Sequence, residues 1–95
     1  MGVADYMEMH QVRYFLALCE ERNFTRAAKR CGVAQPSLTR AIRLLEGALG
    51  GELFYRNQSE TRLTKLGKLV KPRMLRINLE TERALQVAQT FALRY

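Results

Sequence analysis

Residues 25–45 of the chain, TRAAKRCGVAQPSLTRAIRLL, decide the fold. We predict a short helix that Thr25 caps, because its hydroxyl can accept from backbone N–H groups that the first turn leaves unpaired. Gly32 is expected to end this helix, since glycine adopts the positive φ of a helix C-terminus without strain. Pro36 stands where a second helix would begin, and a proline costs no hydrogen bond in a first turn. The segment therefore predicts two short helices joined by a tight turn.

The second predicted helix is amphipathic. Its apolar residues recur at spacings of four, three and four and form one buried stripe: Leu38, Ile42, Leu45 and Leu49. The opposite face carries Pro36, Thr39, Arg40 and Arg43. Two helices joined in this way are typical of a helix-turn-helix, whose second helix lies in the major groove of DNA.

Charge is distributed unevenly along the chain. There is no acidic residue between Glu21 and Glu46, and the basic residues of that stretch are Arg22, Arg26, Lys29, Arg30, Arg40 and Arg43. The formal net charge is +7 and the pI is near 10.0, which favours an anionic partner. A solvated surface helix has a similar charge pattern. The glycine turn and the helix before it favour DNA reading over that alternative.

The chain resembles the N-terminal winged helix-turn-helix of LysR-type transcriptional regulators, in register from about Met9 to its end. The resemblance rests on segments that follow one another in the family's order: Phe24–Ala28, Gln35–Glu46, Leu49–Gly50, Leu53–Arg56 and Arg62–Gly67. It implies a mainly α fold, with a three-helix core, a short two-stranded wing and a long C-terminal linker helix that dimerises. Family base-side contacts fall on Gln35, Pro36, Ser37, Thr39 and Arg40, and charge adds Arg43. Contacts to DNA phosphates are expected from Arg22, Thr25, Arg26, Lys29, Arg30 and, in the wing, Arg56 and Arg62.

We divide the chain into three parts. Residues 1–8 show no periodicity and are expected to form a frayed leader. Residues 9–63 hold the winged helix-turn-helix, with a first helix that closes near Arg22–Asn23 and a recognition helix that stops at Gly50–Gly51. The wing strands are expected at Leu53–Arg56 and Thr61–Leu63, around a polar turn at 57–60. The tip holds Ser59 and Glu60 where the family often has basic residues, so an ordinary surface turn is the alternative to minor-groove insertion.

Residues 64–95 are predicted to form the linker helix, capped by Thr64 and bent by Pro72. An apolar heptad pattern runs through Leu63 and the dimer-helix residues, which are Val70, Met74, Ile77, Ala84, Ala88 and Phe91. A helix of this length cannot bury such a stripe against one small domain, so we expect a second subunit to cover it. The alternative is that the helix packs on its own domain.

Catalysis is not expected from this composition. One histidine and two cysteines supply no metal cluster or nucleophile–base pair, and no glycine-rich phosphate loop is present. Cys19 and Cys31 lie on predicted core faces as small apolar residues of a reducing compartment. No apolar run approaches the ~20 residues of a membrane span, and no secretory signal opens the chain, so we predict a cytoplasmic protein.

These features predict a sequence-specific transcriptional regulator fragment that binds double-stranded DNA. A homodimer, or a tetramer of the full-length protein, would read an inverted repeat. No cofactor is expected in this chain, because the family's small-molecule effector binds a C-terminal domain that 95 residues do not include. A protein-interaction module that docks through the long helix is the alternative. RNA binding would require exposed aromatic platforms, which the sequence does not suggest.

Overall fold

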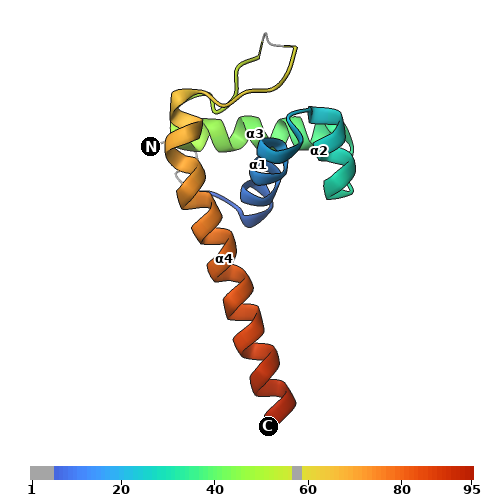
Figure 1. The fold of residues 1–95 in the computed structure, drawn as a ribbon, viewed down its shortest axis with the longest axis vertical. Coiled ribbons are helices and arrows are strands. Elements are labelled where there is room, and N and C mark those ends of the chain that lie inside the picture. The colour runs from blue at the N-terminus through green and yellow to red at the C-terminus, as the bar shows by residue number, and fades with distance from the viewer. Residues whose placement is uncertain (1–5, 57–58) are drawn as a thin grey trace.

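The computed structural model describes residues 6–56 and 59–95. There the chain forms α1 (Met9–Glu21), α2 (Phe24–Cys31), α3 (Gln35–Leu49) and α4 (Lys65–Arg94), in that order (Figure 1). Residues 6–8 of the expected leader precede α1 in non-helical backbone, and residues 1–5 lie outside the described chain. Residues 57–58 of the predicted polar turn also lie outside it.

The helices end at the residues that the sequence indicates, with one exception. Gly32 (φ 71°) ends α2 and Gly50 (φ 83°) ends α3, both in the left-handed conformation. The exception is the start of α2, where the Asn23 side chain accepts from the backbone N–H of Arg26 at 2.8 Å. The prediction that Thr25 caps this helix is therefore wrong. Asparagine is the stronger N-cap, and beginning at Phe24 lets that ring pack against the core.

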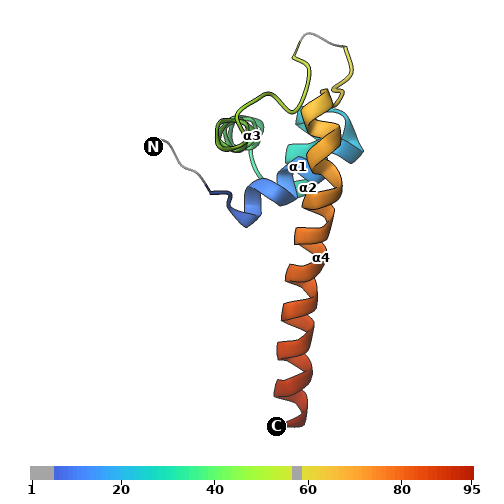
Figure 2. The same cartoon turned by 90° about the vertical axis from the view of Figure 1, so that its left-hand side faces the viewer.

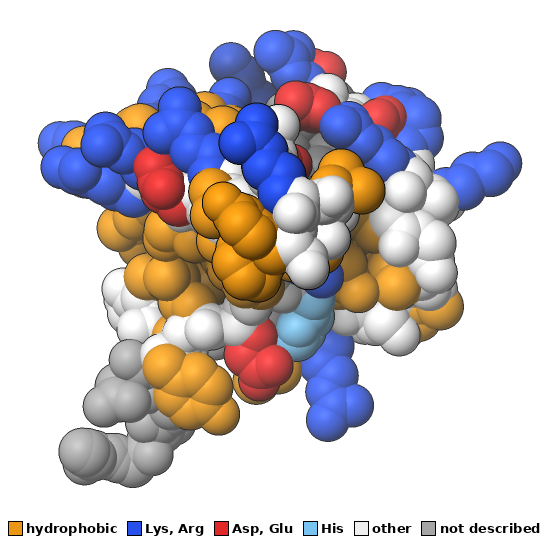
Figure 3. All heavy atoms as spheres, turned by 90° about the horizontal axis from the view of Figure 1, so that it is seen from below, with side chains coloured by type: hydrophobic (Ala, Val, Ile, Leu, Met, Phe, Trp, Pro, Cys, Tyr) orange, Lys and Arg blue, Asp and Glu red, His pale blue; other side chains and the backbone are white. Residues whose placement is uncertain are grey.

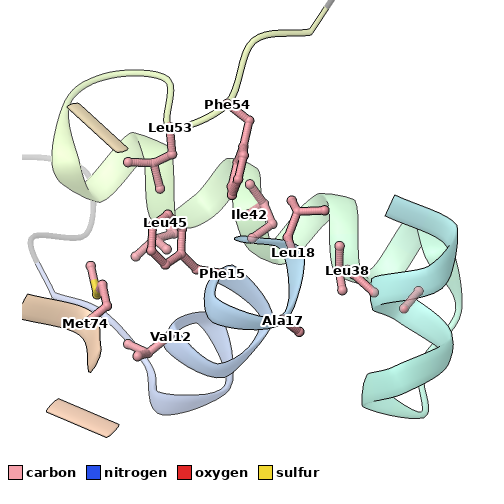
Figure 4. Packing of buried hydrophobic residues seen from close by; sticks show 12 residues of the cluster. Val12, Phe15, Ala17, Leu18, Leu38, Ile42, Leu45, Leu53, Phe54 and Met74 are labelled. Carbon is pink, nitrogen blue, oxygen red and sulfur yellow. The ribbon is translucent and has the colours of Figure 1, made fainter. Parts of the chain in front are cut away.

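The core lies between α1, α2 and α3. Its largest buried side chains on the helices are Phe15 and Leu18 of α1 with Leu38, Ile42 and Leu45 of α3. Leu53 and Phe54, which follow α3, and Met74 of α4 extend the same cluster (Figure 4). Ala27 and Ala28 of α2 are buried as well, and side chains this small let the helices approach closely. The buried stripe predicted for α3 is confirmed at Leu38, Ile42 and Leu45, and Leu49 is half-buried at its end.

The wing, residues 53–63, is pinned at its base. Phe54 and Leu63 form one antiparallel bridge, and the Tyr55 N–H donates to the carbonyl of Arg62 at 2.9 Å. The segments predicted as strands therefore lie side by side. Within the described residues their pairing is limited to this bridge, because the chain turns away from it on both sides.

The long helix α4 leaves the domain after its first turns. Thr64 caps it as predicted, since its hydroxyl accepts from the Gly67 N–H at 3.1 Å. The helix runs through Pro72 without a break. Figure 2 looks along α3 and shows α1 between α3 and α4, in agreement with the packing of α1 against both. Within the described chain, no helix is both long and apolar enough to cross a membrane.

Candidate nucleic-acid interface

The face of α3 that points away from the core is polar and open. Helical geometry places Pro36, Arg40 and Arg43 on the side opposite Leu38, Ile42 and Leu45, and all three of these outward residues are exposed. Gln35 and Ser37 are exposed at the first turn, and Thr39 is half-buried. Gln35 Nε2 donates to Thr39 Oγ1 at 2.9 Å, which orients the amide along the helix surface. The structure thus brings together all six residues predicted for base contact.

Two further residues lie on this face outside the set predicted for base contact. Leu44 is 58% exposed, in agreement with its absence from the predicted buried stripe. It follows Arg40 by four residues, so it lies one turn further along the same side of α3. Gly47 also faces outward, and a Cβ built there would meet no atom within 4 Å. The outward surface of α3 therefore carries, beside its arginines, one exposed apolar side chain at Leu44 and backbone without a side chain at Gly47.

Folding neutralises part of the predicted basic stretch. Carboxylates that precede it in the sequence return to it in space: Arg26 Nε lies 3.6 Å from Glu21 Oε1, and Arg30 contacts both Glu20 and Glu21. The wing contributes another pair, with Arg22 Nη1 3.5 Å from Glu60 Oε2. The field of one sign expected between Glu21 and Glu46 is therefore weaker than the sequence indicated. Lys29 is exposed, and no ion pair forms to it within the described residues.

Arg30 is the most extensively paired of the residues predicted to contact phosphate. Its guanidinium lies 2.6 Å from Glu20 Oε1, and these hydrogen bonds to Glu20 and then to Glu21 raise the pKa of Arg30. Arg30 lines a cleft between α1 and α4 together with Leu75 and Glu82. Arg30 is therefore paired with α1, and phosphate would have to displace two carboxylates to reach it, so the DNA contact expected of Arg30 stays a prediction.

Arg56 is less exposed than Arg30, with 23% of its side-chain surface open to solvent. Its guanidinium pairs with Glu46 of α3 and lies 5.7 Å from the centroid of the Phe24 ring. The same Glu46 carboxylate accepts from the Leu53 N–H at 2.7 Å. Glu46 is therefore a joint between the end of α3 and the start of the wing. Phosphate would have to displace Glu46 to reach Arg56, so the phosphate contact expected of Arg56 stays a prediction, whereas Arg62 is exposed on the returning side of the wing.

The apolar stripe predicted for α4 divides into two parts. Met74 is 2% exposed and Val70 and Ile77 are half-buried, because all three pack on the core of their own chain. Met74 is therefore already covered by its own chain, whereas Val70 and Ile77 keep part of their surface exposed, and the dimer contact expected of them stays a prediction. Ala84, Ala88 and Phe91 are exposed.

Sequence periodicity missed most of the exposed apolar residues of α4. The large ones are Leu69, Leu75, Leu79, Leu85, Val87, Phe91 and Leu93, followed by Tyr95 at the C-cap. Figure 3 looks onto the C-terminal end of α4 and shows hydrophobic side chains exposed over it, with Lys and Arg gathered along one edge of the face. The second half of α4, residues 80–94, projects from the domain (Figure 1) and carries exposed apolar side chains that no described residue covers.

The cysteines are free and half-buried, as expected for small apolar residues. Burial raises the pKa of the Cys19 thiol to about 11, and burial also raises the pKa of Cys31. Within the described residues no group of His, Cys, Asp and Glu side chains is arranged to hold a metal ion.

A small domain that buries one side of a helix and presents arginines from the other, beside a wing, is a winged helix-turn-helix of the DNA-binding class. The family can be stated as well. The chain belongs to the LysR family of bacterial regulatory helix-turn-helix proteins, because the model of that family matches residues 9–68.

Curated relatives agree with this assignment. The chain is 49% identical over 63 residues to the probable cat1 operon transcriptional activator of Acinetobacter lwoffii, a match that covers 66% of the chain and 21% of the relative. It is 38% identical over 86 residues to the HTH-type transcriptional regulator BudR of Klebsiella aerogenes, covering 90% of the chain and 60% of the relative. The chain thus spans between about a fifth and three fifths of these proteins. Because the relatives are transcriptional regulators, the prediction that the chain is not an enzyme is confirmed.

Solved structures confirm the predicted fold class. The structure of the BenM_DBD/catB site 1 DNA complex matches 90% of the chain and 97% of its own chain, with a TM-score of 0.86 and 31% identity. Vibrio fischeri DarR in complex with DNA matches 92% of the chain and 30% of its own, with a TM-score of 0.87 and 31% identity.

Proposed function

We propose that this chain is the DNA-binding part of a bacterial transcriptional regulator that acts in the cytoplasm as a homodimer on an inverted repeat. The observation that carries the proposal is the outward face of α3. Its arginines are exposed while the opposite side of the helix is fully buried, so the helix can enter a major groove without unfolding the domain.

Base contacts are assigned to the exposed side of α3. A free guanidinium at Arg40 or Arg43 matches the paired acceptors O6 and N7 of guanine, and neither residue has an ion-pair partner within the described chain. Gln35, Pro36, Ser37 and Thr39 complete the base-side set at the start of the helix. The hydrogen bond from Gln35 to Thr39 fixes these two side chains relative to each other before DNA binds.

Phosphate contacts are assigned to a smaller set than the sequence suggested. Lys29 is the strongest candidate because its ammonium is exposed and unpaired among the described residues. Arg22, Arg26, Arg62 and the exposed hydroxyl of Thr25 remain in the set. Carboxylates near Arg22 and Arg26 would have to give way to phosphate, so each is expected to contribute less than Lys29.

Dimerisation is assigned to the projecting half of α4. Its exposed Leu85, Val87, Phe91 and Leu93 have no apolar cover within the described chain, and a second copy would supply one. Two copies related by a two-fold axis present two α3 helices, and a matching DNA site must then be an inverted repeat.

Selection of bound duplexes from a random DNA pool tests this function. We expect the enriched sequences to contain two inverted half-sites, with binding that weakens steeply as salt rises. Enrichment of a single unrepeated site would contradict the dimer on DNA. A chain that dimerises but shows no salt-dependent affinity for any duplex would instead be a protein-interaction module.

A further inference from the structure

A cleft of about 650 Å³ opens on the side of the wing that faces α4. The end of α1, the returning strand of the wing and the first two turns of α4 form its walls. Basic side chains from all three segments line it: Arg22, Arg62, Lys65, Lys68 and Lys71. Glu60 is the one carboxylate among the described lining residues, which leaves an excess of four positive charges in the wing cleft.

Most of this charge is not neutralised by the chain itself. Glu60 pairs with Arg22 at 3.5 Å, and both side chains are more than half exposed. Arg62, Lys65, Lys68 and Lys71 form no ion pair with any described residue. Like charges around one cleft repel one another, and a bound polyanion would relieve that repulsion.

The wing separates this cleft from the reading helix. In Figure 2 the chain rises from the end of α3 into the wing and descends to the start of α4, on the other side of the domain. A duplex that takes α3 into its major groove carries the wing over the neighbouring minor groove. A duplex that continues past the wing would bring its backbone toward the cleft on the α4 side of the wing.

We propose that the wing cleft binds the phosphodiester backbone of DNA beyond the base pairs that α3 reads. This inference rests on the proposed function, and it extends the contacts to Lys65, Lys68 and Lys71. Lysines in such a position fix the duplex through point charges and carry no base preference. Their contribution is a longer footprint and a steeper dependence on salt.

Two half-site duplexes test the proposal, with the complete chain as the protein. The short duplex ends where the α3 contacts end, and the long duplex is extended by about one helical turn, roughly ten base pairs, on either side. We expect the wild type to bind the long duplex roughly tenfold more tightly at low salt, with a log–log salt slope steeper by about two. The double variant Lys65→Ala, Lys68→Ala should lose this gain and keep wild-type affinity for the short duplex.

A matched control removes the same charge from the same helix. Arg73 and Arg76 are exposed on α4 and do not line the cleft, so Arg73→Ala, Arg76→Ala should keep the gain on the long duplex. If both double variants lost the long-duplex gain equally, the loss would be a general charge effect. That result would overturn the proposal that the cleft binds DNA phosphates. Retained short-duplex affinity shows that a variant is folded.

Two other outcomes are decisive. A wild-type chain that binds neither duplex overturns the proposed function and this inference together, whereas a lysine variant that keeps the gain overturns this inference alone. Inorganic phosphate, compared with chloride at equal ionic strength, should compete with the DNA backbone for the cleft and selectively reduce the long-duplex gain. Binding of inorganic phosphate that the lysine substitutions abolish, by a wild-type chain that shows no long-duplex gain, would make the cleft a small-anion site and overturn its assignment to the DNA backbone.

Discussion

Arg40 and Lys29 are both exposed cations of the helix-turn-helix, but they belong to different helices and to different parts of the proposed contact. Arg40 lies on the outward face of α3, where a guanidinium can meet base edges. Lys29 lies near the end of α2, and we assign its ammonium to the sugar–phosphate backbone. The two residues therefore separate sequence reading from general affinity.

Arg40→Ala should weaken binding to the selected operator by about 1–3 kcal/mol and relax the choice of one base pair in each half-site. Lys29→Ala should weaken binding to operator and scrambled duplexes alike and lower the salt slope by about one. Anisotropy titrations at several salt concentrations measure both effects. Equal losses on the two duplexes for Arg40→Ala would argue against direct readout by this side chain.

Cys19 gives a pH-dependent test of burial. Burial raises the pKa of its thiol from 9.0 to about 11, so at pH 8 the thiolate fraction is expected to be about 100-fold lower than in the unfolded chain. Iodoacetamide should alkylate Cys19 in the native protein correspondingly slowly, as mass spectrometry can measure. Because the unfolded thiol ionises first, the free energy of unfolding should fall as pH rises from about 9 to about 11. Equal alkylation rates in native and unfolded protein would contradict the burial.

At the scale of residues, sequence reasoning placed the outward face of α3 correctly because helical periodicity determines it. It failed where a long-range contact decides the outcome. Glu46 of α3 forms an ion pair with Arg56 of the wing, and Glu20 of α1 forms one with Arg30 of α2. Neither pairing can be predicted from sequence spacing, since each depends on how separate elements pack.

At the scale of elements, two glycines make a matched pair. Gly67 lies in the first turn of α4, and a Cβ there would overlap the Leu53 carbonyl and lie 2.7 Å from Leu63 Cδ2. Gly47 lies in α3 with open space around its Cα. One glycine lets α4 meet the base of the wing, and the other has no packing role.

Gly67→Ala should therefore lower the free energy of unfolding by about 1–3 kcal/mol through overpacking against the backbone. Gly47→Ala should raise it by about 0.5–1 kcal/mol, because alanine loses less conformational entropy in a helix. Urea unfolding followed by circular dichroism measures both. A neutral Gly67→Ala would mean that α4 does not approach the wing as closely as the structure shows.

The elements themselves were largely predictable. Glycine and threonine signals gave the ends of α2 and α3 and the start of α4, because these caps are local. The heptad pattern of α4 gave a misleading single stripe. The first residues of that stripe, Val70, Met74 and Ile77, pack on the core of the same chain. Only the tertiary structure shows where this packing stops along α4.

At the scale of the whole molecule, the two parts of α4 should respond differently to substitution. Leu85→Ser with Phe91→Ser removes exposed apolar groups, so it should raise the dimer dissociation constant roughly tenfold or more. Met74→Ala should instead cost about 2–5 kcal/mol of folding stability, because Met74 is buried in its own chain. Sedimentation equilibrium and thermal unfolding separate the two effects. An unchanged dissociation constant for the serine variant would place the dimer contact elsewhere.

Two α3 helices of a dimer are proposed to read one duplex from its major groove. Methylation interference on the selected operator tests this proposal most directly, because dimethyl sulfate modifies guanine N7 in that groove. We expect methylation to block binding at guanines in both half-sites, at positions related by the two-fold axis of the operator. Interference confined to one half-site, or absent from the major groove while phosphate ethylation still blocks binding, would contradict it.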